Sequence, residues 1–154
     1  MKYPYLLLDA GGTLVFPDLD LMARVAAAEG SVLEPEGLYE AHFHLMYQYD
    51  VHLREHTAPP SLSLRYFFQE MLIRAGAAKE AAARAVDKLL ARHEETSLWT
   101  YTKPWVLETL AALKQNGFRM SVISNADGRV RQQLEACGLT PYIEAVFDSH
   151  FVGF

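Results

Sequence analysis

Three short apolar runs in the sequence predict strands, and each run ends at polar or glycine residues. The first run is Tyr5–Leu8, which is followed at once by Asp9. The second covers residues 118–123, and the third covers residues 145–147. Continuous apolar runs of this length are typical of parallel strands buried on both faces. The last two runs each follow a segment with helical periodicity, so strand–helix–strand alternation predicts a parallel, doubly wound sheet.

The long segment between the first two runs has helical periodicity and contains no convincing strand. Three or four helical segments are expected there, with breaks at Pro59-Pro60 and Gly76. Their expected ranges are 19–29, 36–55, 62–75 and 79–95. The predicted architecture is therefore α/β. A Rossmann-like parallel sheet core, incomplete in this chain, is formed by residues 1–17 plus 99–154, and an all-helical cap, residues 18–98, is inserted into it.

Composition and charge exclude several classes of protein. The 154 residues include 14 basic and 19 acidic ones, so the net charge is −5. A general nucleic-acid binder usually has a basic excess, so nucleic acid is not an expected partner. The first apolar run is too short for a membrane span or a signal peptide. The single cysteine, Cys137, rules out an internal disulfide and predicts a buried thiol, and a cytoplasmic location is expected.

A first candidate for chemistry follows the first strand, in the segment Asp9-Ala10-Gly11-Gly12-Thr13-Leu14. A carboxylate at the carboxyl end of a buried strand points into the crevice where open α/β sheets bind ligands. The two glycines allow a sharp turn and a close approach of backbone amides to an anion. Thr13 can hydrogen-bond within the loop. The alternative interpretation is an ordinary glycine-rich turn with Asp9 as a turn residue.

A second candidate is Ser124-Asn125, which ends the second strand and precedes a helix. A hydroxyl at this place, together with free amides from the helix start, could hold a phosphate-sized anion. The alternative is that Asn125 or Asp127 only caps the helix. The first two strands of such a sheet are usually neighbours, which favours a shared site for Asp9 and Ser124.

These two motifs together resemble the signatures of the haloacid dehalogenase-like (HAD) superfamily. Asp9-Ala10-Gly11-Gly12-Thr13-Leu14 looks like the first signature, and Ser124-Asn125 looks like the second. Residues 103–117 resemble the return from a helical cap inserted after the first signature, and residues 138–153 resemble the approach to the third. The resemblance spans the whole chain.

The resemblance implies a phosphatase-type hydrolase that acts on a small phosphorylated molecule. Asp9 would be the nucleophile and would form a covalent aspartyl intermediate. One Asp9 oxygen and the backbone carbonyl of Gly11 would bind Mg²⁺. The residues implied to hold the phosphoryl group are Gly12, Thr13, Ser124 and Asn125.

The sequence departs from the pattern of this family in two ways. Phosphatases of the family usually carry a second aspartate, a general acid/base, two residues after the nucleophile, where this chain has Gly11. The third-signature lysine and the later acidic pair would lie beyond Phe154, so the chain is expected to be a fragment with weak or no activity. The Tyr5–Leu8 strand would then be an exposed edge, which predicts self-association or a second chain that covers it.

Two further functions stay open from the sequence. A dehalogenase-type hydrolase would share the fold and need no metal, although those relatives typically have tyrosine where this chain has Gly11. A non-catalytic interaction module, acting through the cap, would explain the missing acid. In the cap, Tyr39, Phe43, Met46 and Tyr47 recur at helical spacing and are expected to pack in its core.

Overall fold

The computed structural model describes residues 4–55 and 63–152 of the chain. The chain divides into two compact units, Met1–Asp18 with Ser97–Phe154, and Leu19–Thr96. We call the first the sheet unit and the second the helical unit. The Pro59-Pro60 break and the expected helix start at Leu62 lie outside the described residues.

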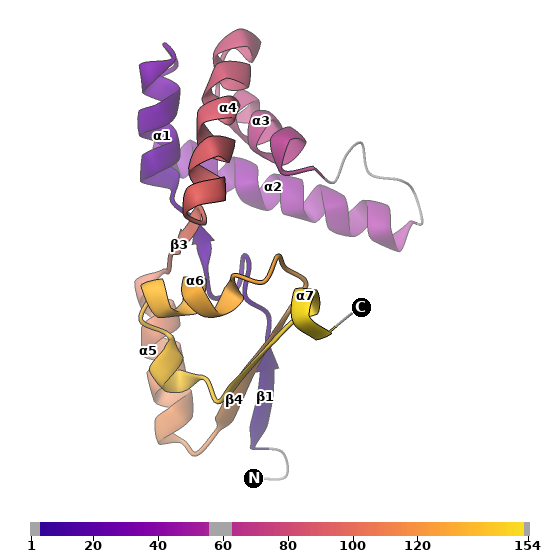
Figure 1. The fold of residues 1–154 in the computed structure, drawn as a ribbon, viewed down its shortest axis with the longest axis vertical. Helices are drawn as coiled ribbons and strands as arrows, with labels where there is room; N and C mark the ends of the chain where they lie inside the picture. The colour runs from indigo at the N-terminus through magenta and orange to yellow at the C-terminus, as the bar shows by residue number, and fades with distance from the viewer. Residues whose placement is uncertain (1–3, 56–62, 153–154) are drawn as a thin grey trace. The chain divides into compact units, whose positions relative to one another are not determined.

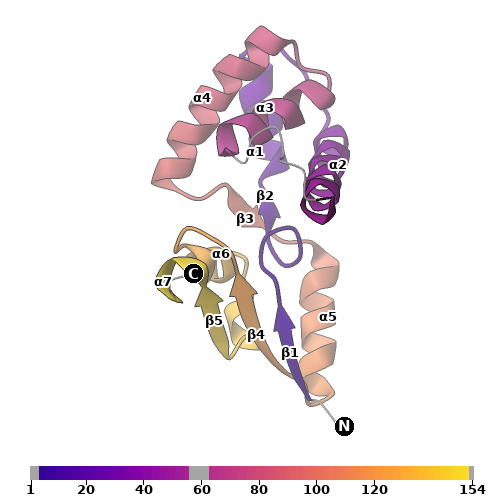
Figure 2. The same ribbon diagram turned by 90° about the vertical axis from the view of Figure 1, so that its right-hand side faces the viewer.

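The sheet unit is built on three parallel strands, which confirms the predicted α/β class. They are β1 (Tyr5–Leu8), β4 (Arg119–Ser124) and β5 (Ala145–Asp148), in the order β1-β4-β5. Figure 2 shows the three arrows side by side and pointing the same way. The helices of this unit are α5 (Pro104–Gln115), α6 (Val130–Ala136) and α7 (Ser149–Val152), with a 3₁₀ turn at Thr140–Tyr142.

A second, two-stranded sheet stands where the chain leaves the sheet unit and returns to it. Strand β2 (Phe16–Pro17) pairs antiparallel with β3 (Trp99–Tyr101). The Asp18 N–H donates to the Leu98 carbonyl at 2.8 Å and extends this contact. Strands of two or three residues are too short to give a periodic signal, so the sequence did not predict this pair.

The two faces of the three-stranded sheet differ in burial. On one face Met120 and Val122 pack against Val106 of α5 and Leu134 of α6, all at most 1% exposed. Figure 1 shows α5 and α6 on the same side of β1 and β4. Large apolar residues on the opposite face are exposed: Tyr5 by 42%, Leu7 by 62%, Ile123 by 54% and Phe147 by 45%. The expectation of strands buried on both faces is therefore wrong for the described residues, because their helices cover mainly one face.

The helical unit consists of four helices that pack around an apolar core. They are α1 (Leu19–Ala28), α2 (Pro35–Arg54), α3 (Leu64–Arg74) and α4 (Lys79–Glu95). Among its fully buried side chains are Met22, Leu38, Phe68, Met71, Leu72 and Leu89. Within residues 4–55 and 63–152, no helix combines the length and the apolar character that crossing a membrane requires.

The aromatic-rich stripe of α2 does not pack in the core of the unit as expected. Phe43, Met46 and Tyr47 are 39%, 44% and 68% exposed. The buried positions of this helix are Leu38, Ala41, His42 and Leu45. These follow the i, i+3, i+4, i+7 spacing of a different helix face. That face forms the core, and the prediction for the aromatic-rich stripe was wrong.

Cys137 has the buried position that its sequence context predicts. Cys137 caps the C-terminus of α6, and its free thiol lies in the apolar core of the sheet unit. Burial raises the pKa of Cys137 to about 11, because an apolar setting disfavours the thiolate. The side chain therefore acts as a small hydrophobic residue.

His42 is a buried polar side chain in the core of the helical unit. It is 3% exposed, and neither ring nitrogen has a hydrogen-bond partner among the described residues. The rings of Phe43 and Phe67 stand edge-on to it, with centroids 5.2 and 5.6 Å away. This apolar burial lowers the pKa of His42 from 6.5 to about 4, because it disfavours the imidazolium.

Replacing His42 by leucine should change how stability depends on pH. As pH falls below 6.5, the unfolded state binds a proton that the folded state refuses until about pH 4. The free energy of unfolding of the parent chain therefore falls by up to about 3 kcal/mol across that window, and that of H42L should not show this fall. Urea unfolding at pH 7 and pH 4.5 measures the difference. H44L, which removes an exposed histidine of the same helix, is the control, and equal pH dependence of H42L and the parent would contradict the prediction.

Replacing Leu7 by lysine should weaken self-association of the chain. Among the described residues β1 pairs with β4 alone, so its other side is a free strand edge. A charge on an edge strand opposes pairing with another strand. We expect the dissociation constant for self-association, from sedimentation velocity over a concentration series, to rise about tenfold or more. Val32→Lys, at an 86% exposed site of the helical unit, is the control, and a parent chain that stays monomeric would refute the expectation.

Candidate active site

The candidate site lies where the carboxyl ends of three parallel strands meet. Asp9 directly follows β1, Ser124 is the last residue of β4, and Asp148 is the last residue of β5. Leu8 is in register with Val122, and Ser124 is in register with Asp148. Neighbouring strands lie about 4.8 Å apart. The register therefore brings the Asp9 and Ser124 strand ends together, which confirms the expectation that the strands carrying the two motifs are neighbours.

The loop after β1 is held by its own backbone and presents Asp9 to solvent. Asp9 is exposed, and its Oδ1 accepts the Ala10 N–H at 2.8 Å. The Ala10 carbonyl accepts the N–H groups of Leu14 at 2.8 Å and Val15 at 3.0 Å. These bonds fix the turn with the carboxylate on its outside.

The two loop residues that were expected to bind phosphate lie at the surface side of this turn. Gly12 adopts a φ of 75°, which favours glycine, and its N–H donates to the Val15 carbonyl at 2.9 Å. That amide is thus used inside the loop. Thr13 is exposed, and its N–H donates to the Ala10 carbonyl at 3.2 Å.

Gly11 lies beside the side chain of Trp99. A Cβ atom added to Gly11 would stand 3.8 Å from the indole nitrogen, Nε1, of Trp99. Trp99 is half-buried and comes from β3, far along the chain from Gly11. Nothing in the sequence pattern pairs these two positions, so this neighbour could be found only in the folded chain.

The donors available for a metal ion near Asp9 are few. Within residues 4–55 and 63–152, no group of three or more histidine, cysteine, aspartate or glutamate side chains could hold a metal ion. Magnesium, however, prefers oxygen ligands, keeps several waters and often takes only one or two carboxylates besides phosphate oxygens. The Asp9 carboxylate and the Gly11 carbonyl fit such an ion in kind, with substrate and water as the other ligands.

The residues after β4 form a loop, residues 125–129, that is tied to the end of β5. Ser124 is half-buried and Asn125 is exposed. The Ser149 hydroxyl donates to Asn125 Oδ1 at 2.9 Å and accepts the Ala126 N–H at 3.1 Å. We call residues 125–129 the β4–α6 loop.

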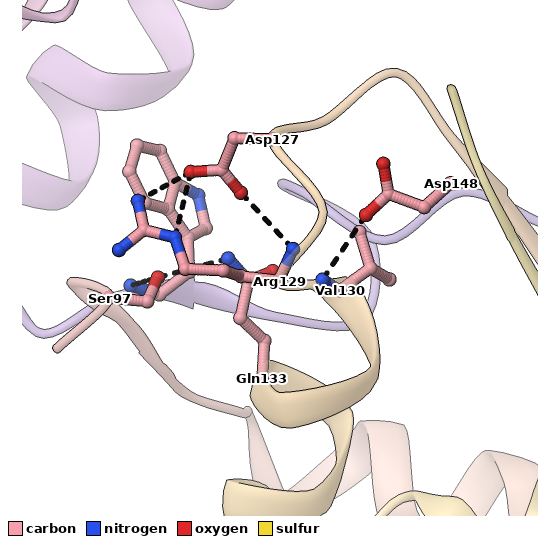
Figure 3. A network of polar contacts seen from close by, with 7 residues as sticks. Ser97, Asp127, Arg129, Val130, Gln133 and Asp148 are labelled. Carbon is pink, nitrogen blue, oxygen red and sulfur yellow. Dashed lines mark hydrogen bonds and ion pairs between the residues drawn. The ribbon is translucent and has the colours of Figure 1, made fainter. Parts of the chain in front are cut away.

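The first backbone N–H of α6 already has a hydrogen-bond partner within the protein. That N–H group, on Val130, donates to Oδ2 of the buried Asp148 at 3.4 Å, so this amide is not free for an anion as the sequence suggested. In the same loop, Asp127 accepts Arg129 Nε at 2.9 Å and is also bonded to its Nη2. Figure 3 shows these contacts together with the Gln133–Ser97 bond, in which Gln133 Nε2 donates at 2.9 Å.

Sequence reasoning assigned no role to Asp148 and Ser149. A signal was present, because both stand at the end of a predicted strand, as Asp9 and Ser124 do. What the sequence does not contain is their contact with residues 125–130, which depends on the parallel pairing of β4 with β5.

Comparison with known proteins yields matches among solved structures only. No protein-family model matches the sequence, and no curated protein matches it. A hydrolase from Streptococcus pneumoniae matches with a TM-score of 0.61 and 19% identity, over 100% of this chain and 70% of that one. YfnB from Bacillus subtilis, described as a HAD-hydrolase bound to magnesium, matches with a TM-score of 0.57 and 18% identity, over 99% and 66%. A structure described as a phosphatase from Clostridium difficile matches with a TM-score of 0.51 and 18% identity, over 99% and 63%.

Identities this low establish the fold and leave the reaction open. A dehalogenase matches with a TM-score of 0.50, so the fold by itself does not choose between phosphate and halide chemistry. The chain spans about two thirds of the length of these structures. The agreement runs over nearly the whole chain and includes the strands that carry Asp9 and Ser124. The chain therefore has the fold of the haloacid dehalogenase-like hydrolases.

Proposed function

We propose that this chain belongs to a phosphatase-type hydrolase that uses Asp9 as its nucleophile. The observation that carries the proposal is the parallel pairing of β1 with β4. It supports a shared site because Asp9 and Ser124 then belong to adjacent strand ends, where open α/β sheets bind their ligands. The substrate would be a small phosphorylated molecule.

In this proposal a carboxylate oxygen of Asp9 attacks the phosphorus atom, and the bond to the leaving oxygen breaks. The acyl phosphate that forms is then hydrolysed by water, which restores the carboxylate. The exposure of Asp9 supports this role, because the substrate must reach it. The Ala10 N–H bond to Oδ1 restrains the orientation of the carboxylate.

Ser124, with Asn125 beside it, would hold the oxygens of the phosphoryl group during transfer. A hydroxyl and an amide side chain can each donate a hydrogen bond to such an oxygen. A magnesium ion bound by Asp9 and the Gly11 carbonyl would reduce the charge repulsion between carboxylate and phosphate. Gly12 and Thr13 would border the phosphate from the loop after β1.

The absence of a carboxyl group at position 11 limits which substrates the site can use. Glycine cannot give a proton to the leaving oxygen, and the space beside it is next to the Trp99 indole. General acid catalysis is typically worth about 10²–10⁴-fold, or roughly 3–5 kcal/mol of barrier. The proposed enzyme is therefore slow on alkyl phosphates and favours leaving groups that need no proton.

A non-catalytic interaction module is the second candidate, and two observations favour it. Gly11 lacks the acid, and Leu7, Ile123 and Phe147 form an exposed apolar face on the sheet. Faces of this kind often mark contacts with other polypeptides. Binding of a partner that survives the loss of Asp9 would support the module over the enzyme.

The first test replaces Asp9 by asparagine. Turnover of p-nitrophenyl phosphate with Mg²⁺ should fall by roughly three orders of magnitude or more, because an amide oxygen is a poor nucleophile. Asp20→Asn, at an exposed site of α1, is the matched control and should keep the parent rate. Equal rates for D9N and D20N would remove Asp9 from the mechanism. Turnover of a 2-haloacid without Mg²⁺ would instead favour the dehalogenase reaction.

A second test compares leaving groups. The efficiency kcat/KM for p-nitrophenyl phosphate should exceed that for a sugar phosphate by about 10²-fold or more, since only the aryl leaving group departs well without a proton. Gly11→Asp should lower the ratio of the two kcat/KM values, because the new carboxyl can protonate the leaving oxygen of the sugar phosphate. Equal efficiencies of the parent chain on both substrates would show that another group supplies the proton.

A further inference from the structure

Ser149 stands at the junction of β5 and the loop that carries the proposed phosphate site. Its hydroxyl donates to Asn125 Oδ1 at 2.9 Å and accepts the Ala126 N–H at 3.1 Å. One side chain therefore bonds both the side chain and the backbone of the first residues after Ser124. These bonds give Ser149 a structural role that does not require its own contact with phosphate.

Asp148, the residue before Ser149, forms hydrogen bonds at the same junction. It is 4% exposed, and its carboxylate accepts the Val130 N–H at 3.4 Å and the His150 N–H at 3.1 Å. A buried carboxylate needs such bonds, because its unpaired charge would be costly. Figure 3 shows Asp148 facing Val130 across the start of α6. Ser149, the next residue, is thus fixed relative to both ends of the β4–α6 loop.

Gly128 shows how closely the β4–α6 loop lies against α7. Its φ is 90°, and a Cβ atom there would stand 2.9 Å from His150 Cδ2 and 3.3 Å from the Phe151 ring. The glycine permits both this backbone conformation and this close approach. Residues 148–151 therefore bond Asn125 and Ala126 of the loop, lie against its Gly128, and bond Val130 at the start of α6.

We propose that Ser149 is a positioning residue that orients Asn125 and the Ala126 backbone, and so keeps the Ser124 strand end in the geometry that holds a phosphoryl group. This inference rests on the proposed function. The side-chain oxygen of Asn125 accepts the Ser149 hydroxyl, so only the NH₂ group of this amide is left to donate a hydrogen bond to an anion. Loss of the Ser149 hydroxyl frees this amide to rotate, and small displacements of catalytic groups cost large factors in rate.

The experiment compares the parent chain with Ser149→Ala and Ser149→Thr. S149T keeps a hydroxyl and should therefore retain the phosphate affinity and the kcat that S149A loses. Thr140→Ala, which removes an exposed hydroxyl of the same unit, is the control. Three quantities are measured: hydrogen exchange at the Ala126 amide by NMR, the Kd of inorganic phosphate in the presence of Mg²⁺, and kcat and KM for p-nitrophenyl phosphate.

We expect S149A to speed exchange at Ala126, to weaken phosphate binding about tenfold and to lower kcat roughly ten- to a hundredfold. The Asn125 side-chain amide resonances should shift in the same variant. S149T and T140A should stay within about twofold of the parent chain in phosphate affinity and in kcat.

The contrary outcomes separate this inference from the proposed function. If the parent chain binds phosphate and turns over, and S149A speeds exchange at Ala126 without changing Kd or kcat, Ser149 is only structural and the inference fails alone. If S149A leaves the exchange unchanged, the inference fails at its first step. If the parent chain neither binds phosphate nor turns over, the proposed function fails and the inference falls with it.

Discussion

The parallel pairing of β1 with β4 is the constraint on which the rest of the sheet unit depends. It connects two segments separated by the entire helical unit, and it aligns Leu8 with Val122. Because parallel strands end at the same edge of a sheet, Asp9 and Ser124 stand at neighbouring strand ends. A slip of one residue would turn Met120 and Val122 out of the core, so apolar burial enforces the same register that assembles the site.

The chemistry of the site is decided as much by what stands beside Asp9 as by Asp9 itself. Gly11 contributes a backbone carbonyl and no proton donor, and the neighbouring volume borders the indole of Trp99. In the proposed function, Asp9 has no acid beside it and would transfer a phosphoryl group when the leaving group is stable as an anion. On the other side of the site, Asp148 and Ser149 use buried charge and hydrogen bonds to hold the β4–α6 loop.

The uneven burial of the sheet bears on how the chain exists in solution. One face forms a closed core with α5 and α6, whereas Tyr5, Leu7, Ile123 and Phe147 expose large apolar surfaces on the other. Exposed apolar area and a free strand edge both favour association with another polypeptide. This chain covers 63% to 70% of the length of the matching structures.

The sequence by itself determined the α/β class, the strand Tyr5–Leu8, the helix Lys79–Glu95 and the strand-end positions of Asp9 and Ser124. Local periodicity and the breaks at glycine and proline carry that information. Only the tertiary structure decided the rest. It showed the β2–β3 pair, the exposure of Phe43 and Tyr47, the Trp99 indole beside Gly11 and the Ser149 bonds to the β4–α6 loop. Each of these depends on contacts between residues distant in sequence, or on which of two apolar faces a helix buries, and a local pattern specifies neither.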